Sequence, residues 1–206
     1  MNQGEWVTNR IGEKMKKIVV ATNNQGKLKE IKEILKKYEM LSLKEVNCEI
    51  EVEEDQETFE GNSKKKAQEI ASRTNMPCIA DDTGLCIEAF DGWPGVYTNR
   101  FLGEEATPKQ RNEAILEKMK NLKGEERKAK VVSVVTYCEN GQFIVAKGEL
   151  EGKIAETPRG ENGYGFDPIF EIENGKTYAE LSGEEKNAIS HRRKAIENLE
   201  KQLTNK

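Results

Sequence analysis

The sequence predicts an α/β protein with a mixed central sheet, and three observations lead to this class. Short apolar runs rich in β-branched residues alternate with segments in which apolar residues recur every three or four positions, the patterns of strands and amphipathic helices. Two longer apolar runs flank Asn140-Gly141, a dipeptide typical of a type I′ hairpin turn, so part of the sheet is expected to be antiparallel. The chain ends in a segment of helical periodicity.

The first half of the chain is expected to contain three strands and two helices. A buried strand is predicted over 18–21, and a polar turn then leads into a helix with apolar residues at Leu28, Ile31, Ile34, Leu35 and Tyr38. A second strand is expected near 41–46 and a second helix from about 57 to 73. The third strand, 78–80, is expected to end at Asp81-Asp82, where Gly84 lets the chain turn.

The second half is expected to contain a helix near 109–122, a hairpin of strands over 129–137 and 142–150, and a closing helix with Ile189, Arg192, Ile196, Leu199 and Leu203 at helical spacing. No repeat or low-complexity linker interrupts this pattern, so residues 15–206 are expected to form a single domain. Residues 1–14 show no periodicity and are expected to be an extension outside the fold.

The charge balance argues against a general attraction to polyanions. The 206 residues include 33 Lys and Arg against 37 Asp and Glu, a net charge of −4, so a polyanionic ligand has to be held by a local cluster. No apolar run approaches the ~18 residues that span a bilayer, and no charged-then-apolar leader opens the sequence. We therefore expect a cytoplasmic protein. The four cysteines lie far apart and the chain has one histidine, so no structural zinc site is expected.

The first candidate site follows the first expected strand, in the run Thr22-Asn23-Asn24-Gln25-Gly26-Lys27. Backbone N–H groups and the dipole at a helix start suit a phosphate, and Lys27 adds a point charge, although the run is not a Walker A loop. The alternative is an ordinary strand-to-helix turn, with a threonine or asparagine as N-cap and a surface lysine.

The second candidate is Lys66, on the second expected helix. At about 100° per residue it lies on the same face as Phe59 and Ile70, the inward stripe of this helix. A lysine there either extends to the rim of the core or serves a site. The acidic run over 49–57 precedes the helix, and because such runs are more often solvated edges, Glu54 is weak evidence by itself.

The third candidate is the run Asp81-Asp82-Thr83-Gly84, with two adjacent carboxylates at an expected strand end. Carboxylate oxygens suit Mg²⁺, which keeps most of its waters and takes one or two carboxylates together with substrate phosphates. The alternative is an Asx-type turn. The run Trp93-Pro94-Gly95-Val96-Tyr97 that follows is interpreted as packing.

The last two candidates lie in the C-terminal third. In Gly163-Tyr164-Gly165-Phe166-Asp167-Pro168, small glycines stand beside two aromatic rings against which a flat ligand can lie, although aromatic residues are more often core. Lys186, His191 and Arg192 gather basic groups near the closing helix, where a lone histidine is usually a capping or packing residue. The five candidates together combine cations for phosphates, carboxylates for a divalent ion and a platform for a ring. They describe a metal-dependent nucleotide site.

Five of these motifs also occur in a specific order along the chain, which is more informative than any one of them. They are Thr22-x-Asn-x-x-Lys27, Ala80-Asp-Asp-Thr-Gly-Leu85, Pro94-Gly-Val-Tyr97, Gly163-Tyr-Gly-Phe-Asp-Pro168 and Glu185-Lys-Asn-x-Ile-Ser-His-Arg192. In this order they resemble the inosine/xanthosine triphosphate pyrophosphatase (Ham1-like) family, over about residues 15–203. The resemblance implies a mixed, elongated central sheet flanked by helices, two lobes around a nucleotide-binding groove, and a homodimer. It also implies hydrolysis of ITP, dITP and XTP to the monophosphate and pyrophosphate with Mg²⁺, for which Mn²⁺ is an alternative.

The resemblance further implies roles for the matching residues. Asp82 accepts a proton, Lys66 contacts phosphate, and Glu54 with Asp82 holds the metal, aided by Asp81. The expected substrate contacts are Thr22, Asn23, Asn24, Gln25, Gly26, Lys27, Thr83, Tyr164, Gly165, Phe166, Asp167, Lys186, His191 and Arg192. Thr83 stands where a serine is common, and Glu53 and Asp55 are near alternatives to Glu54.

Two other functions fit parts of the pattern. A nucleotide-sensing or RNA-binding module would use the basic and aromatic residues without turnover, although the net charge of −4 and the Asp81-Asp82 pair argue against RNA. A pyrophosphatase acting on pyrimidine or modified bases is the nearer competitor, and a substrate panel separates it from the first hypothesis.

Overall fold

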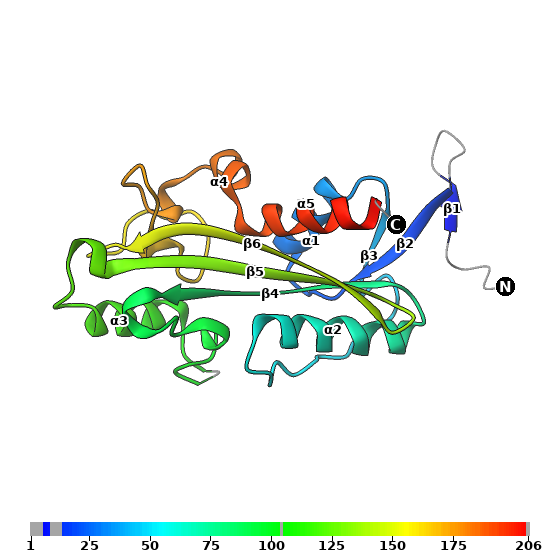
Figure 1. The fold of residues 1–206 in the computed structure, drawn as a ribbon, viewed down its shortest axis with the longest axis horizontal. Helices are drawn as coiled ribbons and strands as arrows, with labels where there is room; N and C mark the ends of the chain where they lie inside the picture. The colour runs from blue at the N-terminus through cyan, green and yellow to red at the C-terminus, as the bar shows by residue number, and fades with distance from the viewer. Residues whose placement is uncertain (1–5, 9–13, 104, 205–206) are drawn as a thin grey trace. The chain divides into compact units, whose positions relative to one another are not determined.

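The computed structural model describes residues 6–8, 14–103 and 105–204 of the chain (Figure 1). Its sheet has seven strands in the order β1-β2-β4-β5-β6-β7, and β3 pairs with β2. The strands are β1 (Trp6–Thr8), β2 (Lys14–Val20), β3 (Glu39–Ser42), β4 (Cys78–Ile87), β5 (Lys128–Glu139), β6 (Gln142–Ile154) and β7 (Phe170–Glu171). β2 pairs in parallel with β3 and β4, whereas the pairs β1–β2 and β6–β7 are antiparallel. The expected α/β class with a mixed sheet is therefore confirmed.

Five α-helices are described: α1 (Gln25–Ile34), α2 (Phe59–Thr74), α3 (Pro108–Lys118), α4 (Gly183–Ile189) and α5 (His191–Thr204). The chain divides into two compact units, each assembled from segments that are distant in sequence. Unit 1 comprises the described residues of 1–82, 133–148 and 192–206, and unit 2 comprises those of 83–132 and 149–191.

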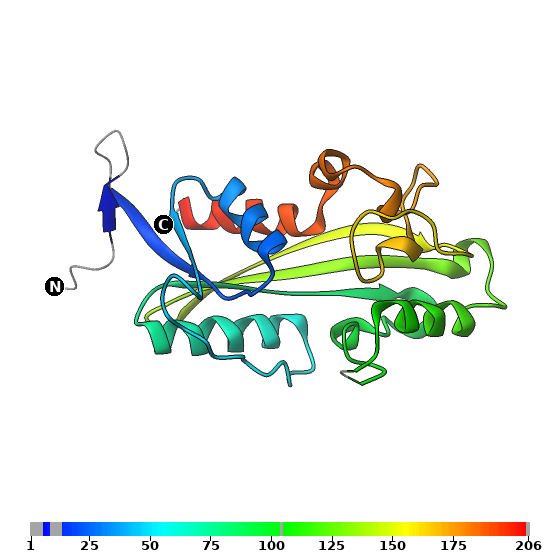
Figure 2. The same cartoon turned by 180° about the vertical axis from the view of Figure 1, so that it is seen from behind.

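Unit 1 has apolar clusters on both faces of its strands because successive side chains of a strand point to opposite sides. Ile18 and Val20 of β2 pack in a cluster with residues of α1 and α5, whereas Val19 packs with Ile70 of α2. Figures 1 and 2 show the same layers, with α1 and α5 on one face of these strands and α2 on the other. Unit 2 has its own core, in which Ile115 and Met119 pack against strand residues such as Leu85.

The β5–β6 connection forms as the Asn140-Gly141 dipeptide predicts. Asn140 has φ 49° and Gly141 has φ 75°, and a type I′ turn needs positive φ at both central residues. Asparagine and glycine are the residues that adopt this conformation at least cost, so the hairpin follows from local chemistry.

Apart from shifts of a few residues at the ends of elements, the structure differs from the sequence-based expectation in three places. β4 does not end at Asp81-Asp82 but continues through Gly84 to Ile87, so the expected turn is wrong. The reason is that Leu85 and Ile87 are both buried in the core of unit 2 and continue the strand. The closing helical pattern is divided between α4 and α5, with Ser190 between them. Within the expected extension, Trp6–Thr8 pairs with β2, Trp6 lying opposite Lys16.

All four cysteines lie in the described part of the chain and carry thiols. Cys48, Cys78 and Cys138 are buried, whereas Cys86 is partly exposed. Burial raises the pKa of the thiols of Cys78 and Cys138. Across the described residues, no helix combines the length and the apolar character that crossing a bilayer requires.

Candidate active site

Asp81 lies where three elements of unit 1 converge. It belongs to β4, which runs parallel to β2 with Val20 opposite Ile79, so the turn that leaves β2 passes beside it. Lys27, in the first turn of α1, places its Nζ 2.9 Å from Asp81 Oδ2, and Arg192, in the first turn of α5, places its Nε 3.3 Å from the same oxygen. The Asp81 side chain is only 2% exposed, so these cations replace water around its charge.

The cations keep Asp81 ionised despite its burial. Burial by itself would raise the pKa of Asp81, but Lys27, Arg192 and Lys66 lower that pKa far below its ordinary value. Asp81 is therefore a permanent carboxylate at neutral pH whose negative charge is balanced by its neighbours.

Lys66 extends from α2 to the other side of this pair of aspartates. Its Nζ forms an ion pair with Glu54 and donates to the backbone oxygen of Asp81 at 2.5 Å. Its side chain is 13% exposed, against 26% for Lys65, so the expected inward orientation of Lys66 is confirmed. Burial lowers the pKa of Lys66, but Asp81, Glu54 and Asp82 outweigh this effect and raise it, so the ammonium stays protonated.

The pKa of Asp82 is shifted in the opposite direction from that of Asp81. It is 4% exposed, and its Oδ2 accepts a hydrogen bond from Asn62 Nδ2 at 2.9 Å. Burial raises the pKa of Asp82; the charges of Glu54 and Asp81 add to this increase, whereas Lys66 and Asn62 oppose it. Adjacent carboxyl groups with opposite pKa shifts are a common arrangement in sites that move protons. Asp82 is thus the better proton acceptor of the two.

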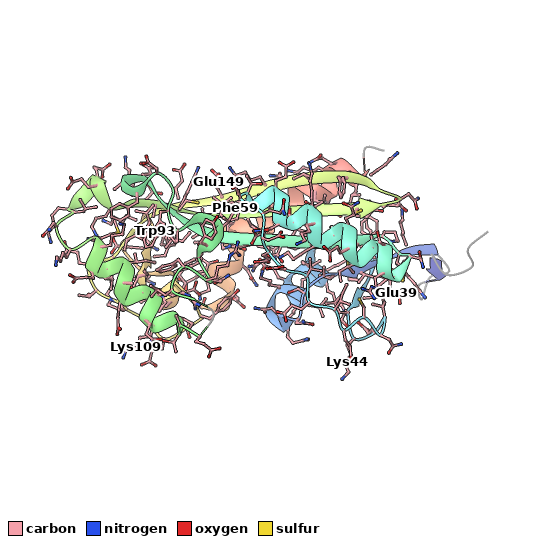
Figure 3. The ribbon with its side chains drawn as sticks, turned by 90° about the horizontal axis from the view of Figure 1, so that it is seen from below. Glu39, Lys44, Phe59, Trp93, Lys109 and Glu149 are labelled. Carbon is pink, nitrogen blue, oxygen red and sulfur yellow. The ribbon has the colours of Figure 1, made fainter. Side chains whose placement is uncertain are left out.

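Glu30 and Asn62 belong to this network although the sequence did not single out either as a site residue. Glu30 Oε2 accepts from Arg192 Nη1 at 2.9 Å, and it lies three residues after Lys27 on the same side of α1. Asn62 shares the inward stripe of α2 with Lys66, and Figure 3 shows this helix with Phe59 labelled at its start. A polar residue on an inward stripe is the signal that could have identified Asn62.

In the turn over Thr22–Lys27, several backbone N–H groups already donate hydrogen bonds to side chains of the same turn. Asn24 is the N-cap of α1, and its Oδ1 accepts from the backbone N–H of Gly26 at 2.9 Å and of Lys27 at 3.2 Å. Thr22 Oγ1 accepts from the N–H of Asn24 at 3.2 Å. The capping interpretation is therefore confirmed for Asn24, while Asn23, Gln25 and Gly26 are exposed. Lys27 is not a surface lysine, because it pairs with Asp81.

The remaining expected site residues lie in unit 2. Lys186 Nζ bonds to Asp167 Oδ2 at 2.8 Å and to the backbone oxygen of Asn162 at 3.0 Å. Asp167 Oδ2 also accepts from the backbone N–H of Tyr164 at 3.3 Å, and the Tyr164 side chain is 62% exposed. Asn112 Nδ2 donates to the backbone oxygen of Gly165 at 2.9 Å. This segment is thus held from both sides while one ring remains open to solvent.

The other members of that group have packing contacts. Phe166 packs against the core of unit 2 and makes an edge-on contact with Phe170, with ring centroids 6.5 Å apart, so the core interpretation applies to this ring. His191 is buried, with its ring centroid 6.5 Å from that of Tyr178. Thr83 lies within β4, directly after Asp82.

Gly163→Ala is expected to disrupt the Lys186–Asp167 pair. Gly163 has φ +97°, and a Cβ there would lie 2.0 Å from Asp167 Oδ2 and 2.3 Å from Lys186 Nζ. We expect a loss of about 1 to 3 kcal/mol in unfolding free energy from backbone strain, with further loss from the clash. Urea denaturation measures it. Gly175→Ala is the matched control, because Gly175 has φ +79° but open space at its Cβ. Equal losses for the two variants would contradict the role of the clash.

Glu54 and Asp82 are the side chains best suited to a divalent cation. Among the described residues, no group of three or more His, Cys, Asp or Glu side chains is arranged to hold a metal. Mg²⁺ does not need such a group, since one or two carboxylates with water and substrate phosphates are sufficient. Glu54 and Asp82 both interact with Lys66, and the charge of Glu54 raises the pKa of Asp82, an effect that a cation would relieve. Asp81 Oδ2 is already engaged by Lys27 and Arg192.

Comparisons with known proteins give matches that cover nearly the whole chain. The model of the Ham1 family matches residues 18–202. A dITP/XTP pyrophosphatase of Clostridium perfringens is 45% identical over 199 residues, which is 92% of this chain and 98% of that protein, and one of Bacillus subtilis is 42% identical, covering 92% and 98%. A solved HAM1 protein from Coxiella burnetii has a TM-score of 0.86 at 38% identity, covering 93% of this chain and 100% of that one. The Staphylococcus aureus Ham1 protein has a TM-score of 0.85 at 40% identity, covering 92% and 99%.

Proposed function

This chain belongs to the Ham1 family, and we propose from that premise that it is a nucleoside triphosphate pyrophosphatase that hydrolyses dITP, XTP and ITP to the monophosphate and pyrophosphate. The observation that carries the proposal is the Asp81-Asp82 pair. Asp81 is an ionised carboxylate whose charge is balanced by Lys27 and Arg192. Asp82 is a proton acceptor beside Lys66 and Glu54. Such a site offers cations for a polyphosphate and a base for water.

The proposed chemical step uses Asp82 and the two lysines near the aspartate pair. Asp82 orients a water molecule and accepts its proton as the water oxygen bonds to the α-phosphorus. The bond from the α-phosphorus to the oxygen bridging to the β-phosphate breaks, and pyrophosphate leaves with the electron pair. Lys66, which stays protonated, and Lys27 stabilise the charge that develops on the leaving group.

The proposed cofactor is Mg²⁺, with Mn²⁺ as an alternative. Glu54 and Asp82 would hold the ion, which when bound supplies positive charge to the phosphate oxygens and lowers the pKa of coordinated water. The repulsion between these two like-charged carboxylates supports this assignment, and Asp81 assists by fixing Lys27 and Arg192.

Removing divalent ions is expected to abolish most of the activity. EDTA should lower the rate of pyrophosphate release by about two to three orders of magnitude, and added Mg²⁺ should restore it. Glu54→Gln should raise the Mg²⁺ concentration for half-maximal rate at least about tenfold. Asp55→Asn is the matched control, because Asp55 pairs with Lys65 rather than with Lys66. A full rate in EDTA, or equal effects of the two substitutions, would contradict the metal assignment.

The proposed substrate contacts form two groups, one for the triphosphate and one for the nucleoside. The triphosphate would bind at Thr22–Lys27 with Lys66, and the nucleoside at Thr83, Tyr164–Asp167, Lys186, His191 and Arg192. Donors aimed at O6 of hypoxanthine or xanthine would face the amino group of adenine, and an unpaired buried polar group costs about 1 to 3 kcal/mol. This argument favours dITP over dATP, whereas guanine shares the O6 acceptor.

We place the enzyme in the cytoplasm as a homodimer that binds neither nucleic acid nor membrane. The net charge of −4 supports the absence of nucleic acid, and buried thiols suit a reducing compartment. Sedimentation velocity at several concentrations tests the dimer, and a species with the mass of one chain throughout would refute it.

The function is tested by phosphate release from dITP, XTP, ITP, GTP and ATP with Mg²⁺, with and without added inorganic pyrophosphatase. We expect phosphate only when the coupling enzyme is present, and mainly from dITP, XTP and ITP. Phosphate without the coupling enzyme would mean cleavage at the γ-phosphate. Absence of product from every triphosphate would favour a binding protein.

A further inference from the structure

We propose that Asn62 is a positioning residue that links the two carboxylates of the candidate metal site, Glu54 and Asp82. This inference rests on the proposed function. Asn62 is in the first turns of α2 and is fully buried at 0% exposure. Its Nδ2 donates to Asp82 Oδ2 at 2.9 Å, and its Oδ1 accepts from the backbone N–H of Gln56 at 2.9 Å. One carboxamide therefore joins strand β4 to the segment that carries Glu54.

The Glu54 segment depends on such a tether because it has no regular structure. Residues 51–56 belong to neither a helix nor a strand, so no ladder of backbone hydrogen bonds fixes them. Gln56 is two residues after Glu54, and its hydrogen bond to Asn62 fixes the backbone there. The ion pair between Glu54 and Lys66 then acts on a segment whose position is already set.

A close approach of the backbone supports the same conclusion. A Cβ at Gly61 would lie 2.8 Å from the Cβ of Gln56 and 3.0 Å from Thr58 Oγ1. The segment before α2 is therefore folded tightly onto the first turn of that helix, at a position where only glycine leaves enough space. This contact holds Gln56 within reach of the residue that follows Gly61, which is Asn62.

Asn62 acts on Asp82 through the other end of the amide. Because Oδ2 of Asp82 accepts from Asn62, rotation of the carboxylate is restricted and its second oxygen is given a defined direction. A primary amide offers a donor for the carboxylate and an acceptor for the Gln56 N–H on two separate atoms, so that it can bridge both partners. Asn62 therefore sets the geometry of the two carboxylates.

The matched control is Ser63, the next residue on α2. Ser63 is also fully buried, and its Oγ lies 2.7 Å from Thr136 Oγ1 and donates to the backbone oxygen of Glu60 at 3.1 Å, so neither partner is a carboxylate. Ser63→Ala therefore removes buried hydrogen bonds from the same helix turn without touching Asp82 or the Glu54 segment. A purely structural role for Asn62 predicts that Asn62→Ala and Ser63→Ala behave alike.

The test uses the full chain and Mn²⁺ as the probe, measured by electron paramagnetic resonance of the free ion. We expect Asn62→Ala to raise the Mn²⁺ dissociation constant about 10- to 100-fold, and the Mg²⁺ concentration for half-maximal rate by a similar factor. The KM for dITP at saturating Mg²⁺ should stay within about threefold, and Ser63→Ala should leave the ion affinity unchanged. Equal ion affinities for Asn62→Ala and Ser63→Ala would overturn the proposal.

Two further measurements keep the proposal testable if Asn62→Ala does not fold. Asn62→Ser retains a hydroxyl that is too short to bridge both partners, and it should show the same direction of change. In the unsubstituted protein, the Gln56 amide should exchange its hydrogen at least about tenfold more slowly than an open loop amide, and unprotected exchange would overturn the inference. If Mn²⁺ binding by the full chain depends on Asn62 as expected but the unsubstituted protein releases no pyrophosphate from dITP, the proposed function fails while this inference holds.

Discussion

Asp82→Asn is expected to lower kcat for dITP hydrolysis by about two to four orders of magnitude, the usual contribution of a positioned general base. The substitution keeps the shape of the side chain and leaves an oxygen that can accept from Asn62 Nδ2. It removes the group proposed to take the proton of water, together with one of the two charges proposed to hold the cation. Steady-state kinetics with a coupled pyrophosphate assay measure the effect.

The same substitution is not expected to destabilise the protein at neutral pH. Burial raises the pKa of Asp82, so at pH values between its ordinary and its raised pKa the folded protein binds a proton that the unfolded chain has released. Folding stability therefore falls as the pH rises through this window, and the asparagine removes that loss. The midpoint of thermal unfolding at pH 7 should be unchanged or higher.

Asp91→Asn is the matched control for Asp82→Asn. Asp91 is exposed and has φ +52°, a conformation that asparagine also adopts readily. We expect this control to keep both activity and stability. Turnover of Asp82→Asn at the rate of Asp91→Asn would refute the role assigned to Asp82.

Asp81→Asn is expected to have the opposite profile, with a large loss of stability. The side chain is 2% exposed and pairs with Lys27 and Arg192, so the neutral amide removes the counter-charge from Lys27 and leaves Arg192 with Glu30 alone. Breaking a buried pair from one side costs about 3 to 5 kcal/mol, which we expect as the decrease in unfolding free energy. Urea denaturation at pH 7 measures it.

The pH dependence of stability gives a second test of Asp81. Burial opposes ionisation, but the three neighbouring cations lower the pKa of folded Asp81 below that of the unfolded chain. The stabilisation is therefore complete above about pH 4, the ordinary pKa of aspartate, and is lost as the pH falls below it. The curves of unfolding free energy for the unsubstituted protein and Asp81→Asn should converge in acid. Parallel curves, or a urea midpoint equal to that of Asp55→Asn, would contradict the prediction.

The strands and helices could largely be predicted because their signals are local. Leu28 and Ile31 recur at helical spacing and are buried in α1, and Asn140-Gly141 sets the hairpin turn. Gly84 was misinterpreted because a glycine within a strand looks the same in sequence as a glycine in a turn. Its place in β4 is decided by the burial of Leu85 and Ile87, which is a tertiary effect.

The two aspartates show why the candidate site could be predicted only in outline. Asp81 and Asp82 are identical in sequence and adjacent, yet their pKa values shift in opposite directions. The difference arises from partners that are far away along the chain, such as Arg192, 111 positions after Asp81. The role of Asn62 depends likewise on a segment and a strand that no local pattern places beside it.

The burial of three thiols makes cysteine modification a measure of local unfolding. Cys48, Cys78 and Cys138 all belong to unit 1, whereas the partly exposed Cys86 belongs to unit 2. Alkylating reagents attack the thiolate, and the raised pKa values of Cys78 and Cys138 suppress that form as well as access to it. Modification of these two cysteines is therefore limited to moments when unit 1 unfolds locally. The rate at which they are labelled reports the frequency of such openings.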